Sequence, residues 1–332
     1  MQLCAWLQTR LERASNIRID NLEYPRGAGQ SHETILFDAH WEEDGELHNR
    51  GCVVRFKPMD FIMFPDDLFY EQIKVMQIIH ADGRVPVAEV FWVERDASIL
   101  GGEFYVMEKK QGRVPVSIPP YSMSGWFLES TPEQRQTAWL SAATNLAKIH
   151  TLPTDQFEFL RGPEGAEHGL PQEWDKYARY AQWIHQDGPV PVLDEAMERL
   201  AKSMPADENP GLVWGDSRIG NMMFDEAYEV IAVMDWEQPS LGGSLNDLAW
   251  FITLGEMMHG VTGPQGRHLE GMGTREDAIR LWEGITGQSA AGLEWYEEFT
   301  RFKTVCMAIR MGRMRGQTIW DDGEIRSRLN LN

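Results

Sequence analysis

Beyond residue 130, apolar residues recur at intervals of three and four, which is the period of an amphipathic helix. The same period appears over residues 1–14, where Leu3, Trp6, Leu7 and Leu11 share one face. Eight helices are therefore predicted, at 1–14, 67–80, 132–150, 172–186, 192–204, 245–259, 275–287 and 291–316.

Between these helices, shorter stretches alternate apolar and polar residues as strands do. Residues 35–40 and 51–58 flank the turn sequence EEDGEL and predict a hairpin. Further strands are predicted at 87–94, 101–108, 212–216 and 229–236, and a Pro- and Gly-rich connection at 109–122. The pattern predicts an α+β protein with two lobes: a β-rich lobe over 1–108, with five or so antiparallel strands, and a mainly helical lobe over 109–332.

The amino-acid composition limits the classes of function that the protein can have. The 332 residues include 31 basic and 51 acidic side chains, a net charge of 31 − 51 = −20, which disfavours binding to nucleic acid or to anionic membranes. No apolar run is long enough to span a bilayer, and no cleavable signal pattern is visible. Cys4, Cys52 and Cys306 fit neither a disulfide framework nor a zinc site. We expect a cytoplasmic protein.

The segment WGDSRIGNMMF at 214–224 carries the most specific chemistry, together with MDWE at 234–237. Asp216, Asn221 and Asp235 form a D-x-x-x-x-N … D pattern with an apolar run between the last two members. Phosphoryl transfer needs such a set: one carboxylate accepts the proton of the incoming hydroxyl, while an amide and a second carboxylate hold Mg²⁺. A turn or cap role is the alternative for each residue, but the joint spacing favours the catalytic interpretation.

Six segments, in order, resemble the aminoglycoside phosphotransferase and choline kinase superfamily, which has the protein-kinase-like fold. The WGDSRIGN form is most similar to the kinase-like proteins associated with acyl-CoA dehydrogenases. Trp214 stands where most members have a histidine, which argues against a classical antibiotic-resistance enzyme. The segments are residues 27–34, YVMEKKQGR, NLAKIH, WGDSRIGNMMF, VMDWE and NDLAWF.

The resemblance implies a role for each matching residue. Asp216 would be the catalytic base, and Asn221 and Asp235 the Mg²⁺ ligands. Arg218 would approach a phosphate, with a structural salt bridge as its alternative. Asp247 would brace the catalytic loop, with a helix N-cap as its alternative.

Nucleotide binding is assigned by the same resemblance. Gly27, Gly29 and Ser31 would approach the phosphates, although the loop departs from the family pattern. Arg55 would be the phosphate-binding cation, with Lys57 as its rival and Glu71 as its partner on the helix. The backbone of Met107, Glu108 and Lys109 would read the purine, which is ATP with GTP not excluded.

We therefore expect a Mg²⁺-dependent phosphotransferase that uses ATP and acts on a hydroxyl of a small molecule. The resemblance suggests a hydroxyacyl-CoA acceptor, whereas the acidic net charge favours an amino alcohol. One alternative is a pseudokinase that binds nucleotide without transferring phosphate, which the atypical Gly loop favours. A second alternative is a nucleotidyl transferase on the same fold.

Overall fold

The computed structural model describes residues 2–24, 34–59, 62–162, 169–206 and 211–331. Its contacts divide the chain into two compact units, each with its own core. The first unit comprises residues 1–63 and 87–111, and the second comprises 64–86 and 112–332. The chain thus leaves the first unit after residue 63 and returns to it for two strands. The predicted lobe boundary after Glu108 stays a prediction.

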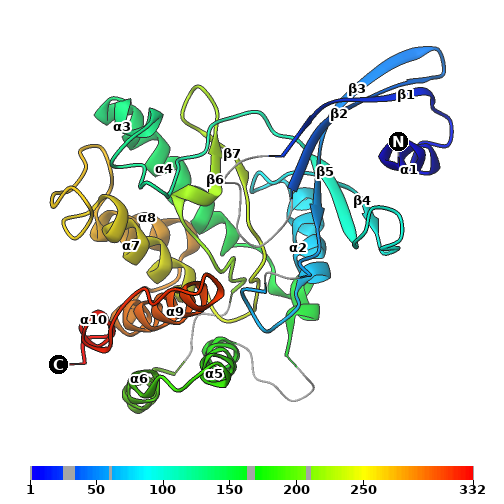
Figure 1. Cartoon of the computed structure of the whole chain (residues 1–332). Helices are drawn as coiled ribbons and strands as arrows, with labels where there is room; N and C mark the ends of the chain where they lie inside the picture. The colour runs from blue at the N-terminus through cyan, green and yellow to red at the C-terminus, as the bar shows by residue number, and fades with distance from the viewer. Residues whose placement is uncertain (1, 25–33, 60–61, 163–168, 207–210, 332) are drawn as a thin grey trace. The chain divides into compact units, whose positions relative to one another are not determined.

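The first unit is built on a five-stranded antiparallel sheet of order β1-β2-β3-β5-β4, in agreement with the predicted β-rich lobe (Figure 1). Asp44 and Gly45 both have positive φ, 53° and 84°, in the predicted hairpin turn between β2 and β3. The elements are α1 (Gln2–Arg10), β1 (Ser15–Glu23), β2 (Thr34–Glu43), β3 (Glu46–Phe56), β4 (Val90–Glu94) and β5 (Phe104–Glu108).

Helix α1 covers this core with the face that its apolar spacing predicts. Trp6 and Leu7 are fully buried, and Leu3 and Leu11 pack against the same cluster. The sequence did not reveal β1, because it is a largely exposed edge strand whose polar side chains obscure the alternation.

The second unit is mainly helical, and the six helices predicted beyond residue 130 are all present. In Figure 1, α9 (red) lies beside α7. The helices are α2 (Phe69–Asp82), α3 (Trp126–Glu129), α4 (Pro132–Ile149), α5 (Leu170–Gln186), α6 (Pro191–Lys202), α7 (Leu245–His259), α8 (Arg275–Thr286), α9 (Leu293–Met314) and α10 (Asp322–Arg328), with short 3-10 turns η1 (Thr154–Leu160) and η2 (Ile219–Asn221).

One two-stranded ribbon interrupts these helices. Its strands are β6 (Met222–Phe224) and β7 (Val230–Val233), and β7 falls within the predicted strand 229–236. The predicted strand at 212–216 is wrong: its apolar residues are buried, but their backbone makes a single bridge, from Val213 to Ser240. No helix within the described ranges is long and apolar enough to cross a membrane.

Candidate active site

A short hairpin brings the two predicted metal ligands together. Asn221 ends η2 and immediately precedes β6, and Asp235 follows the partner strand β7. The N–H of Met234 donates to the carbonyl of Asn221 at 2.9 Å, so Asp235 lies next to Asn221 across the ribbon. Asp235 has φ of +64°, a left-handed conformation that Asp tolerates better than most residues.

Three side chains hold the carboxylate of Asp216 by hydrogen bonds. Arg218 Nε lies 3.0 and 2.9 Å from its two oxygens. Asn221 Nδ2 donates to Oδ2 at 2.7 Å, and Trp250 Nε1 donates to Oδ1 at 2.9 Å. The side chain of Asp216 remains 21% exposed, so an incoming hydroxyl can still reach it.

Arg218 makes the salt bridge that was its alternative role, and its partner is the predicted base itself. A terminal nitrogen of Arg218 also donates to the hydroxyl of Ser117. Burial works against the charged guanidinium, but the adjacent Asp216 carboxylate outweighs it and raises the pKa of Arg218. Arg218 is therefore a fixed cation beside Asp216, while its contact with a phosphate stays a prediction.

Asp247 braces the loop that carries Asp216, as predicted. Its carboxylate accepts from the backbone N–H of Trp214 at 2.5 Å and of Gly215 at 2.9 Å, and its carbonyl accepts from Ser217 Oγ at 2.8 Å. The N-cap of α7 is Ser244, so the alternative role of Asp247 as an N-cap is excluded. Gly215 has φ of +101°, and a Cβ there would lie 2.6 Å from the carbonyl of Gln238. Only glycine fits this approach.

His150 supports this brace. Trp282 Nε1 donates to His150 Nδ1 at 2.7 Å, so the proton of the imidazole is on Nε2, which lies 3.3 Å from Asp247 Oδ2. The indole of Trp214 is fully buried and donates to the carbonyl of Met234 at 2.8 Å, which links the loop that carries Asp216 to the residue before Asp235.

A small pocket, with room for about one water molecule, opens beside this loop, within the second unit. Tyr121 and His259 are buried in its wall and hydrogen-bond to each other at 2.7 Å. Burial, together with His268, lowers the pKa of His259 to about 3, so this pair is neutral at pH 7. Among the described residues that line the pocket, Arg218 alone is charged at that pH. The lining also includes Ser117, Ile219, Phe251, Leu254 and Met258.

The predicted nucleotide-binding residues fall in three places. Gly27, Gly29 and Ser31 lie outside the described residues. Arg55, Lys57, Met107, Glu108 and Lys109 belong to the first unit, and Glu71 lies on α2 in the second. The pairing of Glu71 with Arg55 therefore stays a prediction.

Several of these residues have partners within the first unit. Lys57 lies 3.8 Å from Glu103, and Lys109 Nζ donates to Asp38 at 2.9 Å. The backbone N–H groups of Glu108 and Lys109 donate to the carbonyls of Glu89 and Gly51. Purine recognition by residues 107–109 stays a prediction.

Comparison with known proteins gives a family match. Residues 47–290 match the model of the "phosphotransferase enzyme family". The chain is 32% identical over 228 residues to mouse acyl-CoA dehydrogenase family member 11, which covers 67% of this chain and 26% of the relative. It is 26% identical over 231 residues to the probable acyl-CoA dehydrogenase IBR3 of Arabidopsis thaliana, which covers 68% and 27%. The chain thus spans about a quarter of the length of these relatives.

Solved structures give the same fold. A Ralstonia eutropha protein assigned to the aminoglycoside phosphotransferases matches with a TM-score of 0.70 at 21% identity, covering 99% of this chain and 94% of that one. The macrolide 2'-phosphotransferase MphH of Brachybacterium faecium matches with a TM-score of 0.58 at 14% identity, covering 100% and 99%. The α+β, kinase-like architecture agrees with the sequence prediction.

Proposed function

Because the chain belongs to the phosphotransferase enzyme family, we propose that it transfers the γ-phosphoryl group of ATP to a hydroxyl group of a small molecule. One observation carries this proposal: Asp216 is fixed by three side chains and lies beside the adjacent pair Asn221 and Asp235. A turn or cap function would not require such an arrangement.

The chemistry that follows is an in-line displacement. The acceptor oxygen forms a bond to the γ-phosphorus while the bond to the ADP oxygen breaks, and the hydroxyl proton passes to Asp216. Arg218 holds the carboxylate of Asp216 and supplies a fixed positive charge next to the reacting phosphoryl group.

Asn221 and Asp235 suit Mg²⁺. Asn221 uses its Nδ2 on Asp216, which leaves Oδ1 as an oxygen ligand, and Asp235 contributes a carboxylate. Mg²⁺ prefers such oxygen ligands and commonly takes the rest from water and phosphate. The ion would neutralise charge on the nucleotide phosphates.

For the nucleotide we propose the residues that the family resemblance indicates: Arg55, or Lys57 in its place, for the phosphates, and the backbone of residues 107–109 for the purine. ATP is our first choice because one structural relative is described as a streptomycin–ATP complex, and GTP is second because another is described with GDP. A cytoplasmic location is part of the proposal and rests on composition.

The charge of the pocket favours one kind of acceptor. Its single charged lining group is the guanidinium of Arg218, and most of its remaining side chains are apolar. That guanidinium is paired with Asp216, and no acidic side chain among the described lining residues would attract a cationic amino alcohol, even though the net charge of the whole chain is −20. We therefore propose a hydroxyacyl-CoA rather than an amino alcohol, in line with the acyl-CoA dehydrogenase names of the relatives.

The first test is calorimetric titration of the protein with ATP, with and without Mg²⁺. We expect Mg²⁺-dependent binding that is lost in Asp235→Asn, which keeps the left-handed backbone, and kept in Asp225→Asn, a half-buried turn residue. Hydroxyacyl-CoA thioesters and amino alcohols are then screened for ADP release. Asp216→Ala should abolish turnover and change MgATP affinity by no more than a few fold, because Asp216 acts on the acceptor. An active Asp216→Ala variant would refute its assignment as the base.

One observation favours a second candidate, a nucleotide-binding protein without transfer activity: Arg218 already engages both oxygens of Asp216. The products separate the candidates. A phosphotransferase releases ADP, a pseudokinase binds MgATP and releases nothing, and a nucleotidyl transferase releases pyrophosphate.

A further inference from the structure

Among the described residues that bind the Asp216 carboxylate, Trp250 is the one to which the proposed mechanism gives no task. It lies on α7 with 3% of its surface exposed, and its indole N–H donates to Asp216 Oδ1 at 2.9 Å. Arg218 and Asn221 also serve the phosphoryl group and the metal in that mechanism. An indole has a single polar hydrogen, so the N–H of Trp250 acts on Asp216 alone.

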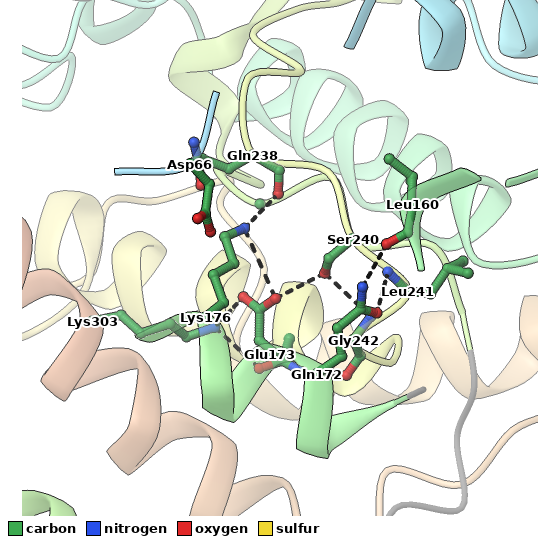
Figure 2. Close-up of polar contacts among 12 residues, drawn as sticks. Asp66, Leu160, Gln172, Glu173, Lys176, Gln238, Ser240, Leu241, Gly242 and Lys303 are labelled. Carbon is green, nitrogen blue, oxygen red and sulfur yellow. Dashed lines mark hydrogen bonds and ion pairs between the residues drawn. The ribbon is translucent and has the colours of Figure 1, made fainter. Parts of the chain in front are cut away.

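A buried charged cluster lies near the ring of Trp250 and approaches it through Lys303, which also lies over the rings of Tyr177 and Phe299. Lys303 Nζ lies 5.8 Å from the centroid of the Trp250 ring and donates to Asn246 Oδ1 at 3.0 Å. It also lies 3.4 Å from Glu173 Oε1 (Figure 2). Lys303 and Glu173 are 3% and 1% exposed. Burial opposes ionisation of Glu173, but the ammonium groups of Lys176 and Lys303 outweigh it and hold the pKa of that carboxyl below its ordinary value.

Residues of the same cluster also contact the segment that packs against the backbone just before Asp216. Ser240 Oγ donates to Glu173 Oε2 at 2.8 Å, and Lys176 Nζ donates to the carbonyl of Gln238 at 3.0 Å (Figure 2). That carbonyl is the atom against which Gly215 packs, one residue before Asp216. The cluster therefore fixes both the indole that binds Asp216 and the backbone that carries it.

We propose that Trp250 is a positioning residue that orients the carboxylate of Asp216 for proton transfer, and that the buried Glu173–Lys303 pair holds its indole in place. This inference rests on the proposed function. A buried ion pair contributes little to stability compared with apolar packing, so a role in fixing one geometry is a sufficient reason for its presence here.

The test is steady-state turnover of MgATP with water as the acceptor, measured as ADP release. Trp250→Phe keeps the ring and removes the N–H. We expect kcat to fall roughly tenfold while KM for ATP stays within about twofold, since a lost hydrogen bond to a charged group misplaces the base without touching the nucleotide. Trp295→Phe is the matched control, because it removes an indole bond of 3.0 Å to the carbonyl of Leu200, and its kcat should equal that of the wild type.

A double-mutant cycle tests the part played by Lys303. If Lys303 acts through Trp250, Lys303→Met should lower kcat in the wild type and have little further effect in Trp250→Phe. Additive effects would overturn the role of Lys303. If Lys303→Met does not fold, the Trp250 and Trp295 variants still decide the main point.

Different results would overturn the positioning role of Trp250 and the proposed phosphotransferase function. A wild-type kcat that Trp250→Phe leaves unchanged overturns the positioning role and leaves the phosphotransferase intact. A wild-type protein that binds MgATP but releases no ADP, either with water or with any of the screened hydroxyl acceptors, overturns the proposed function, and this inference with it.

Discussion

The two oxygens of Asp247 accept hydrogen bonds from two different backbone N–H groups, those of Trp214 and Gly215. Asparagine has one carbonyl oxygen, so in Asp247→Asn the amide nitrogen would face one of these donors. Asp225 provides a contrast, because Ala227 and Glu229 both donate to its Oδ1 alone in an exposed turn.

We predict that Asp247→Asn lowers the free energy of unfolding by about 1–3 kcal/mol, the penalty for leaving a buried donor unsatisfied. It should also lower kcat, because the loop that carries Asp216 loses its brace. Urea unfolding and ADP release measure the two effects. Asp225→Asn should change neither, and equal effects in the two variants would contradict the brace.

The sequence revealed the residues that we propose for the reaction better than those that we propose to orient them. Asp216, Asn221 and Asp235 stand out because polar residues interrupt apolar runs at a specific spacing. Trp250 has no such signal: a tryptophan in an apolar helix is the pattern of an ordinary core residue. Glu173 and Lys303 are charged, and charged residues on helices are normally read as solvent-exposed.

At the scale of elements, the catalytic loop and the segment at 238–242 approach each other at Gly215. We predict that Gly215→Ala lowers the free energy of unfolding by more than about 1 kcal/mol and nearly abolishes ADP release. A methyl group would displace the loop, and the backbone φ at this position would be strained for alanine. Gly284→Ala is the control: it lies in helix α8 with open space around it. The Gly284→Ala change should raise the free energy of unfolding by about 0.5–1 kcal/mol. Thermal melts and ADP release compare the two.

Helix α1 is tied to the sheet by Glu94 on β4. Glu94 accepts from the backbone N–H of Asp96 at 2.9 Å and from Trp6 Nε1 at 2.8 Å, and it pairs with Arg10. These bonds, led by that of Asp96, lower its pKa from 4.5 to about 2. Because the folded state has the lower pKa, this stabilisation is complete above pH 4.5 and is lost as the pH falls towards 2.

We therefore expect Glu94→Gln to lower the free energy of unfolding by about 1–3 kcal/mol at pH 7, with the difference shrinking between pH 4.5 and 2. Urea titrations at several pH values measure it. Glu46→Gln, on the exposed start of β3, should show no such dependence. A difference that stays constant with pH would mean that packing, rather than charge, is what Glu94 contributes.

Periodicity predicted the long elements well, since α7 begins and ends at the predicted residues and α4, α5 and α8 differ by a residue or two. Periodicity failed where residues are buried in the core but their backbone does not pair with a neighbouring strand. Residues 212–214 are apolar because they lie in the core, yet the backbone of Trp214 and Gly215 is held by the side chain of Asp247 rather than by a strand. Periodicity does not reveal a partner so distant along the chain, and only the family resemblance pointed to Asp247.

For the whole molecule, the two spatial units do not correspond to two continuous stretches of the chain. Residues 64–86 belong to the second unit: Pro86 accepts from Val233 N, Arg84 donates to the carbonyl of Thr151, and Lys74 lies over the ring of Phe159. A boundary drawn along the sequence would separate α2 from these contacts.

We predict that residues 112–332 alone fold poorly, whereas 64–86 joined to 112–332 by a glycine-serine linker of roughly 25 residues gives a cooperative unit. Far-UV circular dichroism with thermal melting compares the two proteins. If 112–332 alone melts as cooperatively as the linked form, the contacts of α2 contribute little to the second unit.

The left-handed backbone at Asp235 restricts how this protein can change over evolutionary time. Aspartate, asparagine and glycine accept that conformation with little strain, whereas most other side chains would disturb the fold as well as the chemistry. Asparagine and glycine are each one nucleotide change away from aspartate. A lineage can thus lose the carboxylate at Asp235 and keep its shape, so an inactive descendant would arise by a short mutational path and would persist as a folded protein.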